Sequence, residues 1–167
     1  FLNNKEIGFS FPGRFLLRNY ERLVHWWNAN SKKQAKKNIF YHYDLGNEFY
    51  SKWLDNTMTY SSALFNSSTE SLEKAQENKY KNICKNINPK PEDHILEIGC
   101  GWGGFMEYAI KHHNVKVTGL TISKAQHDFT KKRLFEAGLS DRAKVLLTDY
   151  RNQKGQFDGI ASIEMFE

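Results

Sequence analysis

A glycine-rich stretch at residues 95–104, with the sequence ILEIGCGWGG, constrains the fold of this chain most strongly. An apolar run that carries a single acid, Glu97, leads into glycines at positions 99, 101, 103 and 104, and a helix-like segment follows. This order is typical of the first strand, tight turn and helix N-terminus of a doubly wound α/β domain. Glycines let a ligand approach the backbone closely, and free N–H groups at the helix start would face that ligand.

The sequence after this stretch argues against a dinucleotide as the ligand. A pyrophosphate-binding loop is usually followed, about 20 residues later, by an acid that holds the ribose hydroxyls. Residues 118–123, TGLTIS, contain no carboxylate, and the acid lies inside the first strand at Glu97. A negative charge there favours a cationic ligand, so a sulfonium such as S-adenosylmethionine fits better than a pyrophosphate. A glycine-rich turn with a purely structural role is the alternative.

Strands and helices are predicted to alternate through the second half of the chain. Ser123 and Gln126 have the spacing of a capping box that opens a helix, and Gly138 stops that helix. Alternation of this kind predicts a parallel sheet with right-handed crossovers and helices on both faces. Strands are expected at 94–99, 115–120, 143–147 and 157–163, and a further helix at 102–112.

A helix is also expected just before this sheet. Residues 67–69, SST, offer its N-cap, and Pro89 and Pro91 end it. We place a domain boundary near residue 68, with a helical cap at 1–68 and a cofactor-binding core at 69–167. Residues 41–60 are dense in aromatic and polar side chains and lack a clean helical or strand period.

Two N-terminal segments could contact a membrane. Residues 14–29 have an amphipathic helical pattern, which is the ordinary mark of a helix that faces its own core but would also suit a bilayer surface. Residues 32–37, KKQAKK, hold four lysines and could contact phosphates or form a solvated linker. The net charge of +5 is a mild excess, and no run of 18 apolar residues is present.

Both ends of the chain look cut, because it begins at Phe1 and stops at Glu167 inside an apolar run. We therefore expect a fragment that lacks the last part of its sheet and is inactive alone. The two cysteines, Cys84 and Cys100, give no metal-binding spacing and are expected to be packed side chains, not nucleophiles. No metal site is predicted.

Several motifs in order resemble the cyclopropane fatty acid synthase family, whose members are S-adenosylmethionine-dependent methyltransferases with a Rossmann-like fold. The resemblance covers roughly residues 38–167. The motifs that carry it are YHYDLGNEFY at 41–50, MTYSSA at 58–63, ILEIGCGWGG at 95–104, VTGLTISKAQ at 117–126, DYR at 149–151 and SIEMFE at 162–167.

The resemblance implies a set of site residues. Glycines 99 and 101 would approach the methionine part of the cofactor, Thr121 and Ser123 would bind its ribose, and Asp149 or the Tyr150 backbone would meet the adenine. A bicarbonate ion would act as the base, held by Glu167 and the backbone of Ser62. The implied cofactor contacts are Tyr60, Ser61, Ile95, Leu96, Glu97, Ile98, Gly99, Cys100, Gly101, Trp102, Gly103, Thr121, Ile122, Ser123, Gln126, Asp149, Tyr150 and Arg151.

The implied reaction adds a one-carbon unit from S-adenosylmethionine to the double bond of an unsaturated phospholipid acyl chain. Aromatic faces such as Tyr43, Phe49, Trp53 and Tyr60 could stabilise the transient cation. Many family members carry cysteine where this chain has Ser62, so a relative that makes methyl or methylene branches is an alternative to cyclopropane synthesis.

The same residues would also suit a small-molecule methyltransferase of this fold or a non-catalytic cofactor- or membrane-binding module. We expect a cytoplasmic protein that associates peripherally with membranes and does not bind nucleic acid. The oligomeric state is left open.

Overall fold

The computed structural model describes residues 46–165. All of them belong to one compact unit, Lys36–Glu167. The amphipathic pattern at 14–29, the lysines at 32–37, the residues Tyr41, His42, Tyr43 and Asp44, and the proposed bicarbonate ligand Glu167 lie outside the described residues. The boundary expected near residue 68 stays a prediction.

Four parallel strands form the sheet, in the order β3-β2-β1-β4. The apolar run before the glycines supplies the central strand β1, which pairs with both β2 and β4. The predicted strands are confirmed, with ends that shift by at most two residues. They span β1 His94–Ile98, β2 Lys116–Thr121, β3 Ala143–Leu147 and β4 Gly159–Ser162.

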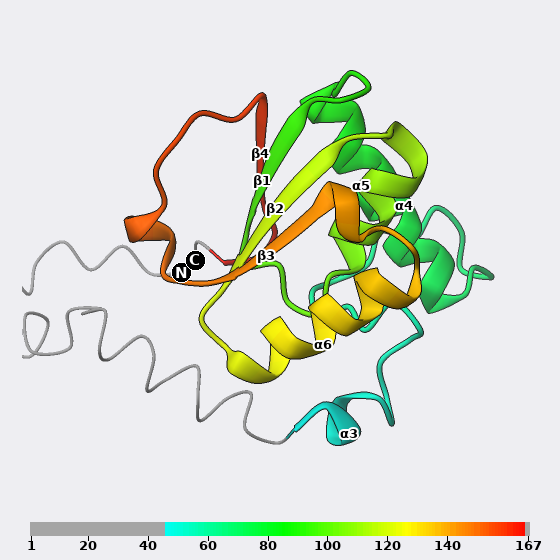
Figure 1. Ribbon diagram of the computed structural model, residues 1–167. Coiled ribbons are helices and arrows are strands. Elements are labelled where there is room, and N and C mark those ends of the chain that lie inside the picture. Colours follow the sequence, from blue (N-terminus) through cyan, green and yellow to red (C-terminus); the bar gives the residue numbers. More distant parts are fainter. Residues whose placement is uncertain (1–45, 166–167) are drawn as a thin grey trace, which may run out of the picture. The chain divides into compact units, whose positions relative to one another are not determined.

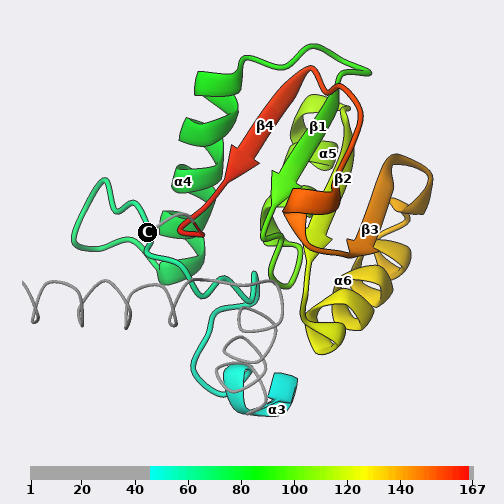
Figure 2. The same ribbon diagram turned by 90° about the vertical axis from the view of Figure 1, so that its left-hand side faces the viewer.

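Three long helices pack on one face of this sheet (Figures 1 and 2). They are α4 Leu72–Ile87, α5 Gly104–His113 and α6 Lys124–Glu136. Short helices occur at α3 Gly46–Tyr50, η1 Ser140–Arg142 and η2 Tyr150–Asn152. Within the described range, the second face of the sheet carries the loop that contains η2, so a full helical layer on that face stays a prediction.

The start of α4 differs from the prediction. Ser71 is the N-cap and its hydroxyl accepts from the Lys74 N–H, so the helix begins later than the SST sequence indicated. The physical reason is that the Ser67 hydroxyl accepts from the Thr69 N–H, which closes a separate turn. At the other end Asn88, in the left-handed conformation, caps the helix before the prolines.

The N-cap of α6 is Ser123, as predicted, and its hydroxyl accepts from the Gln126 N–H. The reciprocal half of the capping box is absent. The Gln126 side chain accepts a hydrogen bond from the Thr121 hydroxyl at 2.9 Å, and Thr121 Oγ1 accepts from the Ser123 N–H. These bonds tie the end of β2 to the start of α6.

The core lies between the sheet and the helices. Ile95 and Val117 from the sheet pack with Phe105 and Met106 from α5, and all four side chains are almost completely buried. This packing fixes where the carboxyl ends of β1 and β2 point. No helix among residues 46–165 is long and apolar enough to cross a bilayer.

Candidate functional site

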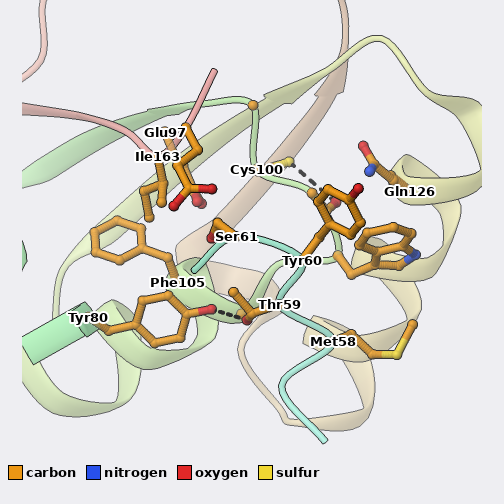
Figure 3. Close-up of a pocket in the computed structure, with 15 residues that line it drawn as sticks. Met58, Thr59, Tyr60, Ser61, Tyr80, Glu97, Cys100, Phe105, Gln126 and Ile163 are labelled. Carbon is orange, nitrogen blue, oxygen red and sulfur yellow. Dashed lines mark hydrogen bonds between the residues drawn. The ribbon is translucent and has the colours of Figure 1, made fainter. Parts of the chain in front are cut away.

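A pocket of about 220 Å³ opens beside the carboxyl end of β1 (Figure 3). This is the edge at which parallel α/β sheets bind their ligands. Its walls come from the glycine loop (residues 99–104), from β1, α4, α5 and α6, and from a segment before α4 that we call the cap loop (residues 57–64). The lining residues are Met58, Thr59, Tyr60, Ser61, Tyr80, Glu97, Gly99, Cys100, Gly101, Trp102, Gly104, Phe105, Gln126, Ile163 and Glu164.

Two glycines of the loop serve different purposes. Gly101 has φ +53°, and a Cβ built there would meet no atom within 4 Å, so the backbone borders open space at this point. A Cβ on Gly104 would lie 2.5 Å from the Tyr80 hydroxyl and 3.0 Å from the Thr57 carbonyl. The first glycine therefore leaves room for a ligand, whereas the second lets the cap loop pack on the start of α5.

Glu97 is the most unusual group in the pocket. Its side chain is only 3% exposed, and its Oε2 atom accepts no hydrogen bond from the part of the chain that the structure describes. Burial raises the pKa of this carboxyl to about 8, and the positive charge of Lys79 opposes that shift. In Figure 3 the carboxylate points into the pocket. A buried, unpartnered carboxyl is costly unless a ligand completes it, so the pocket is built to receive a donor or a cation here.

The structure brings together only part of the predicted cofactor set. Eight of those residues line the pocket, whereas Ile95, Leu96 and Thr121 do not line it. Ile95 and Leu96 are buried in the sheet, and the Thr121 hydroxyl is engaged by Gln126. The pocket-lining members of the predicted set are Tyr60, Ser61, Glu97, Gly99, Cys100, Gly101, Trp102 and Gln126.

Asp149 and Arg151 form an ion pair in the segment that follows β3. Asp149 is 6% exposed, and its carboxylate accepts from the backbone N–H and the guanidinium of Arg151, at 2.6 Å for the shortest contact. Among the described residues, neither residue lines the pocket, nor does Tyr150, Ile98, Gly103, Ile122 or Ser123. Their predicted contacts with the cofactor stay predictions.

Two polar residues of α4 that the sequence did not single out hold the cap loop in place. Gln76 Nε2 donates to the Ser61 carbonyl at 2.9 Å, and Lys79 Nζ donates to Ser61 Oγ at 2.6 Å and to the Ser62 carbonyl at 2.8 Å. Burial lowers the pKa of Lys79 to about 8. The only feature of the sequence that pointed to Gln76 and Lys79 was their i, i+3 spacing, which places them on the face of α4 that also carries Tyr80.

Tyr80 adds a further link between α4 and the cap loop. Its hydroxyl forms a short hydrogen bond with Thr59, which in turn bonds Thr57 at 2.7 Å. Burial raises the pKa of Tyr80 above its ordinary range. The phenol therefore stays neutral and acts as a structural hydrogen-bonding group at the pocket edge.

Ser62 and Glu164 meet at the mouth of the pocket. The Ser62 N–H donates to Glu164 Oε1 at 3.0 Å, and the Ser62 hydroxyl makes a short bond to the same oxygen. Glu164 has a left-handed backbone with φ 50°. Ser62 was predicted to belong to an anion site, whereas Glu164 has no local sequence signal that marks it as a site residue.

Aromatic side chains gather around the cap loop. The ring centroid of Tyr60 lies 5.8 Å from that of Tyr50 and 5.9 Å from that of Trp53. The ring centroids of Tyr50 and Trp102 lie 4.9 Å apart. Tyr60 and Trp102 both line the pocket. Of the aromatic residues proposed to stabilise a cation, Tyr60 is therefore the one that the structure places on the pocket wall, and Tyr43 lies outside the described residues.

Both cysteines are buried free thiols, as expected for packed side chains. Burial raises the pKa of Cys84 to about 11 and that of Cys100 well above its usual value. Cys100 lines the pocket through its position in the glycine loop. A thiol that remains protonated is a poor nucleophile, so this position favours a packing role.

Comparison with known proteins adds a family. Residues 30–167 match the family model described as mycolic acid cyclopropane synthetase. The chain is 43% identical over 141 residues to cyclopropane-fatty-acyl-phospholipid synthase of Escherichia coli, covering 84% of this chain and 36% of that protein. It is 38% identical to a probable fatty acid methyltransferase of Pseudomonas putida, covering 83% of this chain and 36% of that protein. The chain thus spans about a third of the length of these curated relatives.

A solved structure supports the same relationship. The mycolic acid cyclopropane synthase CmaA1, crystallised with SAH and CTAB, superposes with a TM-score of 0.74 at 33% identity. The match covers 77% of this chain and 45% of that one. The parallel sheet of residues 46–165 therefore has the Rossmann-like fold of S-adenosylmethionine-dependent methyltransferases.

Proposed function

The chain belongs to the mycolic acid cyclopropane synthetase family, and from that membership we propose that it binds S-adenosylmethionine for the transfer of a one-carbon unit to the double bond of an unsaturated fatty acyl chain. The acyl chain would be part of a phospholipid, as in the name of the Escherichia coli relative. The relatives also include a probable fatty acid methyltransferase, so the product is either a cyclopropane or a branch.

The buried environment of the Glu97 carboxyl is the observation that best supports this proposal. Its buried Oε2 atom has no hydrogen-bond partner among residues 46–165, and the pocket around it is open beside Gly101. S-adenosylmethionine carries two cationic groups, an ammonium and a sulfonium. Either would stabilise the ionised form of a carboxyl whose pKa burial has raised to about 8. A pyrophosphate would instead bring two negative charges next to the same side chain.

The aromatic residues of the pocket fit the same ligand. Tyr60 and Trp102 line the pocket, and an aromatic face turned toward a bound sulfonium would attract it through the ring quadrupole. When bound, S-adenosylmethionine supplies an electrophilic methyl group for attack by the alkene. The roles of this chain are to orient that group between the glycine loop and the cap loop and to keep water away from the reacting carbons.

Bicarbonate fits this site less well than the resemblance implies. Ser62, the one expected bicarbonate-binding residue among residues 46–165, directs both its N–H and its hydroxyl at the Glu164 carboxylate. An anion would have to displace a carboxylate of the same charge from these donors. The donors of Ser62 are therefore occupied and do not fit bicarbonate.

The branching alternative rests on the same position. Where many family members have cysteine, this chain has Ser62, whose hydroxyl provides a second hydrogen bond to Glu164 that reinforces the backbone contact. A proton removed from the added carbon closes a ring or, after a hydride shift along the acyl chain, leaves a methylene branch, whereas a proton removed from a neighbouring chain carbon leaves a methyl branch. The position of the base at the pocket mouth would decide between these products.

Exposed apolar side chains near the pocket support access to lipid. Phe49 lies in α3 and Trp53 follows that helix, whereas Leu64 ends the cap loop and Phe65 comes directly after it; all four side chains are about half exposed. A surface of this kind can rest against the acyl boundary of a bilayer. We therefore include a peripheral membrane position on the cytoplasmic side in the proposal.

The test is the lipid content of cells that express the full-length gene product. Mass spectrometry should show acyl chains that gain one CH₂ unit, and proton NMR should then separate upfield ring protons from vinylidene or branched-methyl signals. The matched control is the Glu97→Gln variant, which keeps the shape of the side chain and removes its charge. If cofactor binding occurs but no lipid changes, a small-molecule methyltransferase or a non-catalytic module replaces this proposal.

A further inference from the structure

Glu164 is a pocket-lining carboxylate without a role in the proposed binding of S-adenosylmethionine. It follows β4 after a single residue, Ile163, and so lies at the carboxyl edge of the sheet. Its backbone has φ 50°, a conformation that non-glycine residues rarely adopt. Such backbone strain concentrates at functional sites, where the surrounding structure maintains it.

The Glu164 carboxylate is held in one orientation by the cap loop. Both donors of Ser62 point at Oε1, and one of these bonds measures 3.0 Å from the backbone nitrogen. The peptide that carries these donors is fixed in turn by α4, because Lys79 donates to the Ser62 carbonyl at 2.8 Å. The second oxygen, Oε2, accepts no hydrogen bond from residues 46–165 and remains available to a substrate.

The two carboxyl groups of the pocket have different environments. Glu97 is fully buried at the floor, whereas Glu164 is exposed at the mouth. Glu97 suits a cation of the cofactor, and a group with that task is not free to accept a proton during the reaction. Two carboxyls in contrasting surroundings commonly take different roles in one active site.

We propose that Glu164 is the general base of the reaction and that its carboxylate, held by Ser62, takes the place of an external bicarbonate ion. This inference rests on the proposed function. The alkene π electrons form the new C–C bond to the methyl carbon while the S–CH₃ bond breaks, which leaves a carbocation on the acyl chain. Oε2 of Glu164 then removes a proton, and the electron pair of that C–H bond closes the ring or forms a branched alkene. The proton on the carboxyl is released to solvent.

The experiment uses the full-length gene product with vesicles of dioleoylphosphatidylglycerol and S-adenosylmethionine, in CO₂-free buffer and with added bicarbonate. Formation of S-adenosylhomocysteine and of modified lipid is measured for the wild type, Glu164→Gln, Glu164→Gly and the control Glu136→Gln. Glu136 is an exposed residue at the end of α6, remote from the pocket lining. Glycine at position 164 also suits the left-handed backbone.

We expect wild-type turnover to be insensitive to bicarbonate and unchanged in the control. Glu164→Gln should lose about 10²- to 10⁴-fold in rate, the usual contribution of a positioned general base. Glu164→Gly should lose as much and regain rate with added bicarbonate or formate, because the vacated donors of Ser62 can then hold a small carboxylate. Affinity for S-adenosylhomocysteine should stay within about threefold of the wild type in all variants.

A second measurement is independent of turnover. Titration with ¹³C-bicarbonate in the presence of S-adenosylhomocysteine, followed by NMR line broadening, should show binding to Glu164→Gly and none to the wild type. If the wild type binds bicarbonate, or if its turnover of lipid requires bicarbonate, the general-base role of Glu164 is wrong and the proposed function still holds. A wild type that modifies no lipid overturns both.

Discussion

Trp102 in the glycine loop donates its indole N–H to the side-chain carbonyl of Asn47 in α3, at 2.7 Å and across 55 sequence positions. Trp102 is 4% exposed and packs against Tyr50. This bond joins the aromatic–polar segment before α4 to the loop that borders the candidate pocket. The two segments are therefore parts of one site, although the sequence places a helix and a strand between them.

Replacing Asn47 with alanine tests this link. The change removes the acceptor from a buried N–H, which typically costs about 1–3 kcal/mol. Denaturant unfolding should show a loss of that size for Asn47→Ala. The matched control is Ser51→Ala, which removes an exposed hydrogen bond to the Glu48 carbonyl and should change stability by less than about 0.5 kcal/mol. Equal effects of the two variants would contradict the structural role of the Trp102 contact.

A second prediction concerns the open space beside Gly101. Gly101→Ala and Gly138→Ala place a methyl group at φ +53° and φ +70° respectively, and neither Cβ meets an atom within 4 Å. Both should therefore lose about 1–2 kcal/mol of stability from left-handed strain. Calorimetry should show weakened S-adenosylhomocysteine binding for Gly101→Ala alone, because Gly138 lies at the far end of α6. A similar loss of affinity in both variants would show that Gly101 does not border the ligand.

The raised pKa of Glu97 makes stability depend on pH. Its folded pKa of about 8 lies above the unfolded value near 4.5, so the folded state binds more protons between these limits. The Glu97 contribution is therefore fully present below about pH 4.5 and is lost as pH rises through about 8. Lys79, Cys84 and Cys100 interact with the same carboxyl, and the two thiols stay protonated over this range.

The measurement is the free energy of unfolding of ligand-free protein between pH 5 and pH 8.5, compared with Glu97→Gln. The difference between the wild type and the variant should shift in favour of the variant as pH rises. S-adenosylmethionine binding should oppose this trend and release a proton below pH 8, visible as heats that depend on the ionisation enthalpy of the buffer. A pH-independent difference would mean that Glu97 titrates normally.

The hydrogen bonds of Lys79 should hold the cap loop in its position. Lys79→Met keeps the length of the side chain and removes the donors to Ser61 and Ser62. Amide hydrogen exchange of residues 60–62 should become faster by about tenfold or more, because a charged hydrogen bond contributes about 1.5–3 kcal/mol. Lys81→Met, an exposed change two positions further along α4, should leave exchange unchanged. Unaltered exchange in Lys79→Met would remove the positioning role.

The sequence predicted the sheet well because apolar runs and glycine clusters are local signals. All four described strands and the N-cap at Ser123 follow from patterns within a few residues. Glu97 was also identified, since a lone acid inside an apolar strand is conspicuous. The N-cap of α4 was missed because three neighbouring hydroxyl residues compete for the same local bonds, and the choice of Ser71 depends on where the cap loop enters the helix.

The second half of the pocket was less predictable. Gln76, Lys79 and Glu164 reach the site across long sequence separations, and each is a residue type that would equally suit a solvated surface. The contact between Ser62 and Glu164 spans 102 positions. No local pattern encodes such a pairing, because it depends on the packing of the cap loop against the end of β4.

The most direct test of the proposed function is to follow a deuterium label from the methyl group of S-adenosylmethionine into the lipid. The purified full-length gene product is incubated with S-adenosylmethionine that carries a CD₃ group and with vesicles of unsaturated phospholipid, and the acyl chains are analysed by mass spectrometry. We expect one added carbon, which retains two deuterium atoms when the proton is lost from that carbon (a ring or a methylene branch) and three when the proton leaves a neighbouring carbon. Acyl chains without deuterium, from protein that binds S-adenosylhomocysteine normally, would contradict the proposed function.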